Sequence, residues 1–268
     1  EYAWYNLGNI YFKLKNYKKS IEAFEFAIAI DEEYSSAYNN LAESYLNLEN
    51  YELAKVNFYK SLELDGPSPE IYSAIGRAYH HLEDYSSSIN YFQKSIKIDQ
   101  FFKESYYWLG KSLVSLDKWF EAIHYFKKAY KLNNENVDYI KSLAFAEFKV
   151  GNMVSSIDLY NRALEIDPTD YKTSLDYSFI YYESGDIEKA IKIIKDSIEE
   201  VPSESLLYYR LVIYLMDSGR YKESINVLES ALSLNFDNHE VLFDFVPNFE
   251  TQSALIRVIN QYRKNELQ

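Results

Sequence analysis

The chain contains no cysteine among its 268 residues, and this absence excludes several kinds of chemistry. Without cysteine the protein has no disulfide, no thiolate ligand for a metal ion and no cysteine nucleophile. The same absence leaves the redox compartment open, because a chain without thiols is compatible with either environment. No run of about 18 or more apolar residues is present either, so the sequence predicts no membrane-spanning helix.

Glycine and proline are scarce, with 7 and 5 residues, which favours long helices over a sheet with many turns. Basic residues are also outnumbered, since 28 Lys and Arg stand against 41 Asp and Glu, for a net charge of −13. A protein that binds nucleic acid generally needs a basic face for the phosphates, so this charge argues against a nucleic-acid partner. Among the successive fifty-residue stretches from residue 1 to residue 250, only 101–150 is not net acidic.

Aromatic residues are abundant, with 28 Tyr and 16 Phe, and they recur with a period of 34 residues. Residues 4–28 read WYNLGNIYFKLKNYKKSIEAFEFAI, and residues 38–62 read YNNLAESYLNLENYELAKVNFYKSL. The period continues without insertion or deletion through residue 238. A large apolar position recurs as Trp4, Tyr38, Tyr72, Tyr106, Ile140 and Tyr208, with a lapse at Ser174.

Small and large residues alternate within each repeat. A small position recurs as Gly8, Ala42, Gly76, Gly110, Ala144 and Ser178, and a late large position as Phe24, Phe58, Phe92, Phe126, Tyr160, Ile194 and Leu228. Spacings of 3, 4 and 7 place each set on one face of a helix, so two helices are expected to approach closely. A polar break separates the halves, and in the last three repeats Gly151, Gly185 and Gly219 suit a left-handed residue that ends a helix.

Each unit is therefore predicted to be a helix–turn–helix of 34 residues, and the pattern resembles the tetratricopeptide repeat (TPR) family. Repeat one carries the family's residues at Trp4, Leu7, Gly8, Tyr11, Phe24 and Ala27, and departs from them at Ser20 and Glu32. The seven repeats are 1–34, 35–68, 69–102, 103–136, 137–170, 171–204 and 205–238. The resemblance implies an all-α fold, a right-handed superhelical solenoid of antiparallel helix pairs, with a concave groove lined by the first helices.

Residues 239–268 break the period, and we interpret them as a degenerate eighth hairpin with a C-terminal capping helix. HEVLFDFV is predicted to begin a helix that Pro247 stops, and TQSALIRVINQYRKN is predicted to form the final helix. One face of that helix carries Ala254, Leu255, Val258, Ile259 and Tyr262. The chain begins at Glu1 without Met or a visible signal, so we interpret it as a trimmed piece of a longer protein and expect a cytoplasmic location.

No constellation of residues predicts catalysis or a cofactor. The 4 histidines are His80, His81, His124 and His239, and none has metal-ligand spacing. The glycines form no phosphate-binding loop, and the acidic pairs stand at helix ends, where solvated charge is the ordinary interpretation. We therefore expect a non-catalytic protein whose function resides in the groove.

Three groups of residues occupy the positions that the resemblance places in the groove. Repeats one and two offer Asn6, Asn9 and Asn40, whose amides suit the backbone of an extended peptide, although ordinary helix-surface asparagine is the alternative. Repeats three to five offer cations and a histidine beside Tyr107 and Trp108, and these are Arg77, His81, Lys111, Lys141 and Lys149. A positive groove in an acidic protein would attract anionic ligands, whereas the alternative is a solvated face that neutralises nearby acids.

The third group lies in repeats five to seven. It consists of Phe145, Phe179 and Tyr182, and the apolar surface is extended by Phe148, Leu175, Tyr209, Ile213 and Met216. Arg210 is a further candidate contact in these repeats. Exposed apolar residues in one patch favour an interaction site, and the alternative is that they pack between repeats. The carboxylate clamp known in the family is incomplete here, because Tyr5, Glu70 and Ala74, or Phe145 and Asp176, stand where it needs cations or asparagine.

Our first hypothesis is a scaffold that binds a peptide with acidic and aromatic residues. A second is self-assembly, end to end or as a homo-oligomer, through an uncovered N-terminal end and a tyrosine-rich surface. A third is the regulatory arm of an enzyme whose catalytic domain lies outside this sequence. The expected partner is thus a protein or peptide, without cofactor, nucleic acid or direct membrane insertion.

Overall fold

The computed structural model describes residues 1–242 and 253–266, and within them the secondary structure is helical, without strands. The helices of unit 1, defined below, are α1 Tyr2–Lys13, α2 Tyr17–Ile30, α3 Ser35–Asn47, α4 Tyr51–Asp65, α5 Pro69–His81, α6 Tyr85–Ile98, α7 Lys103–Val114, α8 Trp119–Leu132 and α9 Val137–Lys149. Those of unit 2 are α10 Met153–Ile166, α11 Tyr171–Glu183, α12 Ile187–Glu200, α13 Ser205–Asp217, α14 Tyr221–Leu234, the 3-10 helix η1 Phe236–Glu240 and α16 Ser253–Glu266.

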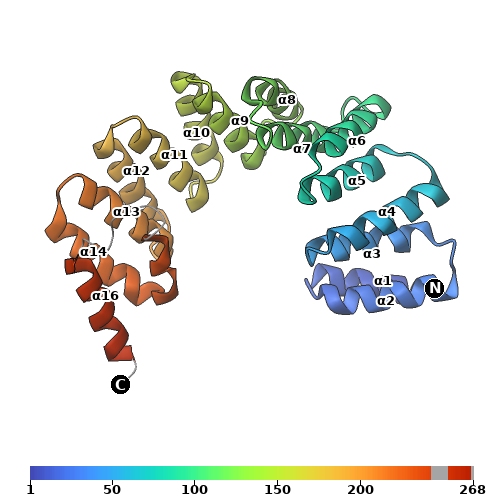
Figure 1. Cartoon of the computed structure of the whole chain (residues 1–268), viewed down its shortest axis with the longest axis horizontal. Helices are drawn as coiled ribbons and strands as arrows, with labels where there is room; N and C mark the ends of the chain where they lie inside the picture. Colours follow the sequence, from blue (N-terminus) through green and yellow to red (C-terminus); the bar gives the residue numbers. More distant parts are fainter. Residues whose placement is uncertain (243–252, 267–268) are drawn as a thin grey trace. The chain divides into compact units, whose positions relative to one another are not determined.

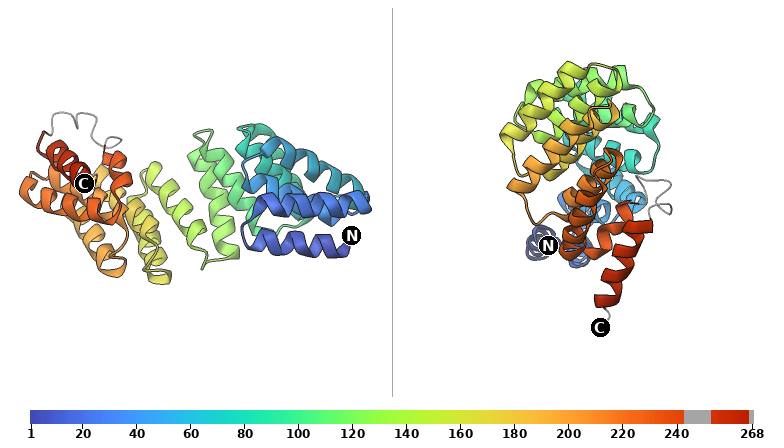
Figure 2. Two further views of the ribbon diagram at one scale, coloured as in Figure 1. Left: turned by 90° about the horizontal axis from the view of Figure 1, so that it is seen from below. Right: turned by 90° about the vertical axis from the view of Figure 1, so that its left-hand side faces the viewer.

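The chain divides into two compact units, Glu1–Val150 and Gly151–Gln268, and each is described by itself. Within unit 1, consecutive helices form antiparallel pairs, such as α1 with α2 and α3 with α4 (Figure 1). Within unit 2, α11 pairs with α12 and α13 with α14. Figure 2 shows the helices from two further sides. The prediction of an all-α chain of paired helices with a 34-residue period is confirmed.

A phenylalanine ring from each second helix of the first four repeats fills the notch left by a small residue on the first helix. The side chain of Phe24 is completely buried, and a Cβ built on Gly8 would lie 2.5 Å from its ring. The same is true of Gly110, where a Cβ would lie 2.5 Å from the buried Phe126 ring. The glycine is therefore required by the close approach of the two helices, as the alternation of small and large residues predicts.

The turn inside each hairpin has one left-handed residue, and it recurs at the same position in all seven repeats. Gly151, Gly185 and Gly219 have φ of 87°, 81° and 78°, which confirms the prediction for these glycines. In the first four repeats the same conformation is adopted without glycine, by Lys15, Glu49, Glu83 and Asp117, with φ between 57° and 61°. A left-handed backbone is strained for residues with a Cβ, so these four turns carry a cost that glycine would relieve.

Buried serines link hairpins in unit 1. Ser20 Oγ donates to the Gly8 carbonyl at 3.0 Å and lies 3.1 Å from Ser44 Oγ of the next repeat. Two repeats later, Ser88 Oγ donates to the Gly76 carbonyl at 2.8 Å and lies 2.9 Å from Ser112 Oγ. Each hydroxyl is thus matched by another hydroxyl across the junction, which satisfies both in an apolar surrounding.

The serine position of the fifth repeat lacks this match. Ser156 occupies the position of Ser20 and Ser88. Ile180, however, occupies the position of Ser44 and Ser112, so no serine is there to form the hydrogen bond. Ser156 Oγ is buried and has no hydrogen-bond partner among the described residues. A buried hydroxyl without a partner costs free energy, so this serine is a local weakness of unit 2.

The last helix packs against the preceding hairpin, beside α14 in Figure 1. Leu255 and Ile259 are 3% and 6% exposed and belong to one apolar cluster with Leu228 and Leu232. This confirms the predicted helix and its apolar face, whereas its role as a cap stays a prediction. The segment before it differs from the expected α-helix at His239, because a 3-10 helix occupies 236–240, and Pro247 lies outside the described residues.

The serine pairs give a first prediction. Ser88→Ala removes the hydrogen bonds of this hydroxyl to the Gly76 carbonyl and to Ser112 and should lower the free energy of unfolding by about 1 kcal/mol. Ser156→Ala removes an unsatisfied hydroxyl at the equivalent position and should leave the stability unchanged or raise it. Urea denaturation of both variants measures the difference, and an equal loss in both would contradict the assignment.

The turns give a second prediction. Glu83→Gly relieves a left-handed residue and should raise the free energy of unfolding by about 0.5–1 kcal/mol. Gly185→Ala at the same turn position of a later repeat should lower it by about 1 kcal/mol, because alanine is strained there. Thermal unfolding of the two variants checks both signs, and a destabilising Glu83→Gly would contradict the argument.

Candidate functional site

The predicted site residues fall into two sets, one in each unit. Unit 1 holds Asn6, Asn9, Asn40, Arg77, His81, Lys111, Lys141, Phe145 and Lys149. Unit 2 holds Phe179, Tyr182 and Arg210. Each set has its own contacts, and these separate residues that are already satisfied within the protein from residues that can meet a ligand.

The asparagines of repeats one and two bond to one another rather than standing as a free row. Asn40 Nδ2 donates to Asn9 Oδ1 at 2.8 Å and to the Tyr5 hydroxyl at 3.1 Å. Asn39 Nδ2 in turn donates to Asn40 Oδ1 at 3.3 Å, so most of the hydrogen-bonding capacity of Asn40 is used between α1 and α3. Asn6 is exposed, and the Nδ2 of Asn9 has no role in these three bonds.

Arg77 is neutralised by a residue that sequence reasoning missed. Its guanidinium forms an ion pair with Glu43 of the preceding repeat, and both side chains are about one quarter exposed, at 25% and 24%. The signal was present in the sequence, because Glu43, Arg77 and Lys111 occupy the same position in three successive repeats. Arg77 and Lys111, which the sequence treats as equivalent cations, are therefore different in the folded protein.

Lys111 has no carboxylate within 4 Å among the described residues. Its Nζ instead lies over aromatic rings, 4.5 Å from the ring centre of Trp108 and 5.7 Å from that of Tyr107. Burial lowers the pKa of Lys111 from its ordinary value of 10.5, and the negative charge of Asp138 opposes this shift. The ammonium is thus partly desolvated and is stabilised by ring faces rather than by an ion pair.

Two histidines complete the surroundings of this lysine. The rings of His80 and His81 lie 5.2 Å and 5.6 Å from that of Trp108, and Tyr51 stacks on His81 at 4.7 Å. Burial, followed by the charges of Lys111 and His81, lowers the pKa of His80 to about 4. We call Lys111, Trp108, His80, His81 and Tyr51 the Lys111 cluster. The pKa of His81 is lowered as well, by burial and then by the charges of Lys111 and Arg77.

A second cation over aromatic rings lies at the end of α9. Lys149 is exposed, and its Nζ is 5.3 Å from the ring of Phe145 and 5.9 Å from that of Trp119. The rings of Trp119 and Phe145 contact each other edge to face at 5.9 Å. Lys141, in contrast, lies 3.6 Å from Asp138 and is 16% exposed, so its charge is partly neutralised.

In unit 2 the predicted apolar surface is smaller than expected. Tyr209 and Ile213 are completely buried and Met216 is 4% exposed, so the prediction that these three line a groove is wrong. The reason is that α13 packs in one apolar cluster with α14, Phe236 and α16. The alternative interpretation of the sequence, in which these side chains pack between helices, is correct for Tyr209, Ile213 and Met216.

Tyr182, Phe179 and Arg210 remain at the surface of unit 2, each partly buried. The Tyr182 hydroxyl donates to Asp217, and its ring stacks on Tyr214 at 4.9 Å. Burial and the neighbouring Asp217 raise the pKa of Tyr182 to about 12. The Arg210 guanidinium lies 5.9 Å from the ring of Tyr214, which is completely buried, so Arg210 and Tyr182 contact the same ring.

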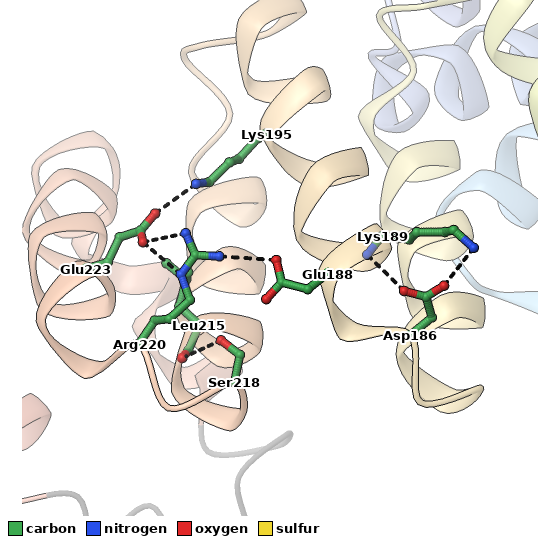
Figure 3. A network of polar contacts seen from close by, with 8 residues as sticks. All are labelled: Asp186, Glu188, Lys189, Lys195, Leu215, Ser218, Arg220 and Glu223. Carbon is green, nitrogen blue, oxygen red and sulfur yellow. Dashed lines mark hydrogen bonds and ion pairs between the residues drawn. The ribbon is translucent and has the colours of Figure 1, made fainter.

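A polar network ties α12 to the start of α14 (Figure 3). Arg220 contacts Glu223 at 2.6 Å and Glu188 at 3.4 Å, and Lys195 contacts Glu223 at 2.8 Å. The acidic and basic side chains of this network form ion pairs with one another, and hydrogen bonding from Lys195 lowers the pKa of Glu223. The network therefore holds hairpins together and offers no unsatisfied charge to a ligand.

The chemistry available in these residues is binding. In the part of the chain that the structure describes, no group of three His, Cys, Asp or Glu residues is placed to hold a metal ion. No helix described here is long and apolar enough to cross a membrane.

The fold of paired helices defines a helical-repeat protein, and five family models specify which kind. All five describe the tetratricopeptide repeat, and they match residues 1–34, 33–100, 103–136, 147–212 and 206–238. The chain belongs to the tetratricopeptide repeat family. Such repeat domains are typically non-catalytic and bind proteins or peptides, and no catalytic family is among the matches.

Solved structures with the same fold show how widely it is used. A chain of the APC/C hetero-tetramer Cut9–Hcn1 is 19% identical, with a TM-score of 0.67 over 78% of this chain and 41% of that chain. The C-terminal part of a TPR protein from Cytophaga hutchinsonii is 19% identical, with a TM-score of 0.64 over 86% and 95%. YrrB, described as a TPR protein with an unusual peptide-binding site, is 24% identical, with a TM-score of 0.53 over 70% and 96%. No curated protein matches this chain.

The lowered pKa of His80 gives a prediction for stability. In the unfolded chain the imidazole takes up a proton near its ordinary value of 6.5, whereas the folded protein takes it up only near 4. The unfolded state therefore binds more protons between these values, and stability should fall as the pH drops from 6.5 to 4. His80→Phe keeps an aromatic ring and removes this dependence in part, as urea denaturation across that range measures. An unchanged slope would contradict the burial of His80.

Proposed function

We propose that this protein is a non-catalytic scaffold that binds a peptide segment of a partner protein, and that the Lys111 cluster recognises an acidic side chain in that segment. The proposal is supported by membership of a family whose domains bind proteins or peptides. The single observation that carries it is the state of Lys111, a partly buried cation without an ion pair among the described residues.

A carboxylate would complete the surroundings of Lys111. Removing an ammonium from water costs free energy unless an opposite charge or a hydrogen-bond acceptor compensates it. Trp108 and Tyr107 supply ring faces, which compensate in part. An incoming Asp or Glu side chain would form an ion pair in a partly desolvated place, where such a pair is stronger than on an open surface. The positive charge of Lys111 also gives selectivity, since the acidic remainder of the protein repels anions elsewhere on its surface.

The surface at the end of α9 suits the aromatic part of such a peptide. Trp119 and Phe145 present ring edges and faces, and Lys149 lies over both rings. Aromatic anchors supply much of the energy in peptide recognition, and a nearby cation adds attraction for an acidic neighbour. Of the other predicted contacts, Asn6 and Asn9 retain groups that can bond to a peptide backbone. Phe179, Tyr182 and Arg210 form a separate candidate surface in unit 2.

A second candidate function, packing against another helical hairpin, is favoured by the surface of α1 and α2. Ile10 is 54% exposed, whereas Ala78 at the equivalent position is completely buried. Phe26 is 54% exposed and stacks on Trp4 at 4.6 Å, in a position where the next three repeats have lysine. An apolar face of this kind suits a second copy of the chain or a further repeat. Sedimentation at increasing protein concentration tests whether a second copy binds this face. If it does, the unaltered protein should associate and the Ile10→Lys variant should stay monomeric.

Selection from a displayed random peptide library tests the first proposal, with Lys111→Met and Arg77→Met as matched variants. We expect the unaltered protein to enrich peptides that contain Asp or Glu together with an aromatic residue. Their affinity should fall at least about tenfold for Lys111→Met, because a charge-assisted contact of about 1.5–3 kcal/mol is lost. Arg77→Met should have a smaller effect, since Glu43 already neutralises Arg77.

The proposal is contradicted if the enriched peptides lack acidic residues, or if Lys111→Met binds them as well as the unaltered protein does. A salt titration adds a second check. Binding through Lys111 should weaken as the ionic strength rises, although less steeply than for a fully exposed ion pair.

A further inference from the structure

Repeat six has lost the large side chain that the other repeats place at the start of the hairpin. Trp4, Tyr38, Tyr72, Tyr106, Ile140 and Tyr208 stand at this position, and Ser174 stands there in repeat six. A serine leaves most of the volume of a tyrosine ring unfilled unless neighbouring side chains move into it.

A cleft of about 520 Å³ lies at this place in unit 2, between α10, α11 and α12, which Figure 1 labels in succession. Its lining includes Ser174, Tyr177 and Tyr181 from α11, and Ser197 from α12. Tyr177 is larger than the Leu or Ile of the other repeats and takes up part of the space, where its hydroxyl donates to Asn161 at 3.0 Å. The cleft remains beside this ring and reaches Pro168 in the turn before α11.

The tyrosines of two other repeats show which group the missing side chain would satisfy. The Tyr106 hydroxyl donates to the carbonyl of Gln100 at 3.1 Å, and the Tyr208 hydroxyl donates to the carbonyl of Pro202 at 3.0 Å. Pro168 stands six residues before Ser174, at the end of repeat five, as Gln100 and Pro202 stand six residues before their tyrosines, and it lines the cleft. Because Ser174 replaces the tyrosine, no phenol of this repeat reaches that carbonyl.

One buried side-chain hydroxyl in the cleft is unsatisfied. Ser197 is 4% exposed, and its Oγ has no hydrogen-bond partner among the described residues. At the equivalent position, Ser61 Oγ lies 3.1 Å from Ser35 Oγ, and Ser95 Oγ donates to the Pro69 carbonyl at 2.7 Å. A buried hydroxyl without a partner points to a ligand that supplies one.

We propose that this cleft binds the side chain of a tyrosine from a partner polypeptide, in place of the aromatic residue that other repeats supply from their own chain. The ring would lie against Leu164, Tyr177 and Ile193, and its hydroxyl would meet the Pro168 carbonyl or Ser197 Oγ. This site is independent of the Lys111 cluster, which lies in unit 1.

Binding of two small probes tests the proposal: p-cresol, which is the side-chain analogue of tyrosine, and N-acetyl-tyrosinamide, which adds the main chain. Both should shift the amide NMR signals of α11 and α12, and N-acetyl-phenylalaninamide should bind about tenfold more weakly, because the site's carbonyl and hydroxyl would stay unpaired. Binding of p-cresol without N-acetyl-tyrosinamide would mean a site for free phenols only and would overturn the proposal, as would binding of neither.

Ser174→Tyr fills the cleft from within the chain. It should reduce the affinity for N-acetyl-tyrosinamide at least about tenfold and raise the midpoint of thermal unfolding. The control Ser203→Tyr adds a tyrosine at an exposed turn of the same unit and should change neither quantity. Equal affinity in Ser174→Tyr and the unaltered protein would overturn the proposal.

A reciprocal variant keeps the test decisive if Ser174→Tyr does not fold. Tyr106→Ser removes the equivalent ring in unit 1 and should be destabilised, and p-cresol should raise its midpoint of unfolding by more than that of the unaltered protein. A crystal of the unaltered protein soaked with N-acetyl-tyrosinamide gives direct evidence. Density in the cleft of repeat six supports the proposal, and an unoccupied cleft contradicts it.

Discussion

The contact between a phenylalanine ring and a small residue on the facing helix, which is glycine in repeats one, three and four and Ala42 in repeat two, sets the spacing on which the rest of unit 1 depends. The ring of Phe24 occupies space that a Cβ on Gly8 would need, and Phe126 does the same at Gly110. Because the two helices lie this close, Ser20 reaches the carbonyl of Gly8 and can also meet Ser44 of the next repeat. The packing within a hairpin therefore fixes the contacts between hairpins. Together these contacts determine where the side chains of the first helices lie.

Repetition makes departures informative, because each residue can be compared with its equivalents in the same molecule. Ser88 has a serine partner, whereas Ser156 faces an isoleucine position and stays unsatisfied. Ser174 lacks the ring that its equivalents have, and a cleft lies beside it. Such irregularities cost stability, and sites that bind a ligand commonly carry such a cost. Unit 2 holds these departures, and unit 1 holds the cation without an ion pair.

Much of the fold could be predicted from the sequence, because the 34-residue period fixes which residues share a face. The helices, the glycine turns and the apolar face of α16 were predictable in this way. The left-handed turns at Lys15 and Glu83 were not, since neither residue type favours that conformation. The buried state of Tyr209 and Ile213 was missed as well, because it depends on what packs over α13 and not on the position within the repeat.

The sequence predicts which residues of the candidate site occupy equivalent positions in the repeats, but it does not predict which ion pairs and ring contacts they form. The period placed Arg77 and Lys111 in equivalent positions, yet only the folded protein shows that Glu43 neutralises one and that rings surround the other. Ion pairs and aromatic contacts depend on side-chain geometry between repeats, which the spacing along one helix does not contain. For this reason the proposed site centres on Lys111 and its neighbours and not on the whole basic stretch.

The pKa of Lys111, followed by NMR through its side-chain carbon signals, tests the central claim most directly. A partly desolvated ammonium without an ion pair should titrate below 10.5 in the free protein. Its pKa should then rise when an acidic peptide binds, because a carboxylate stabilises the charged form. A pKa at or above the ordinary value in the free protein, or one that an acidic peptide leaves unchanged, would contradict the account.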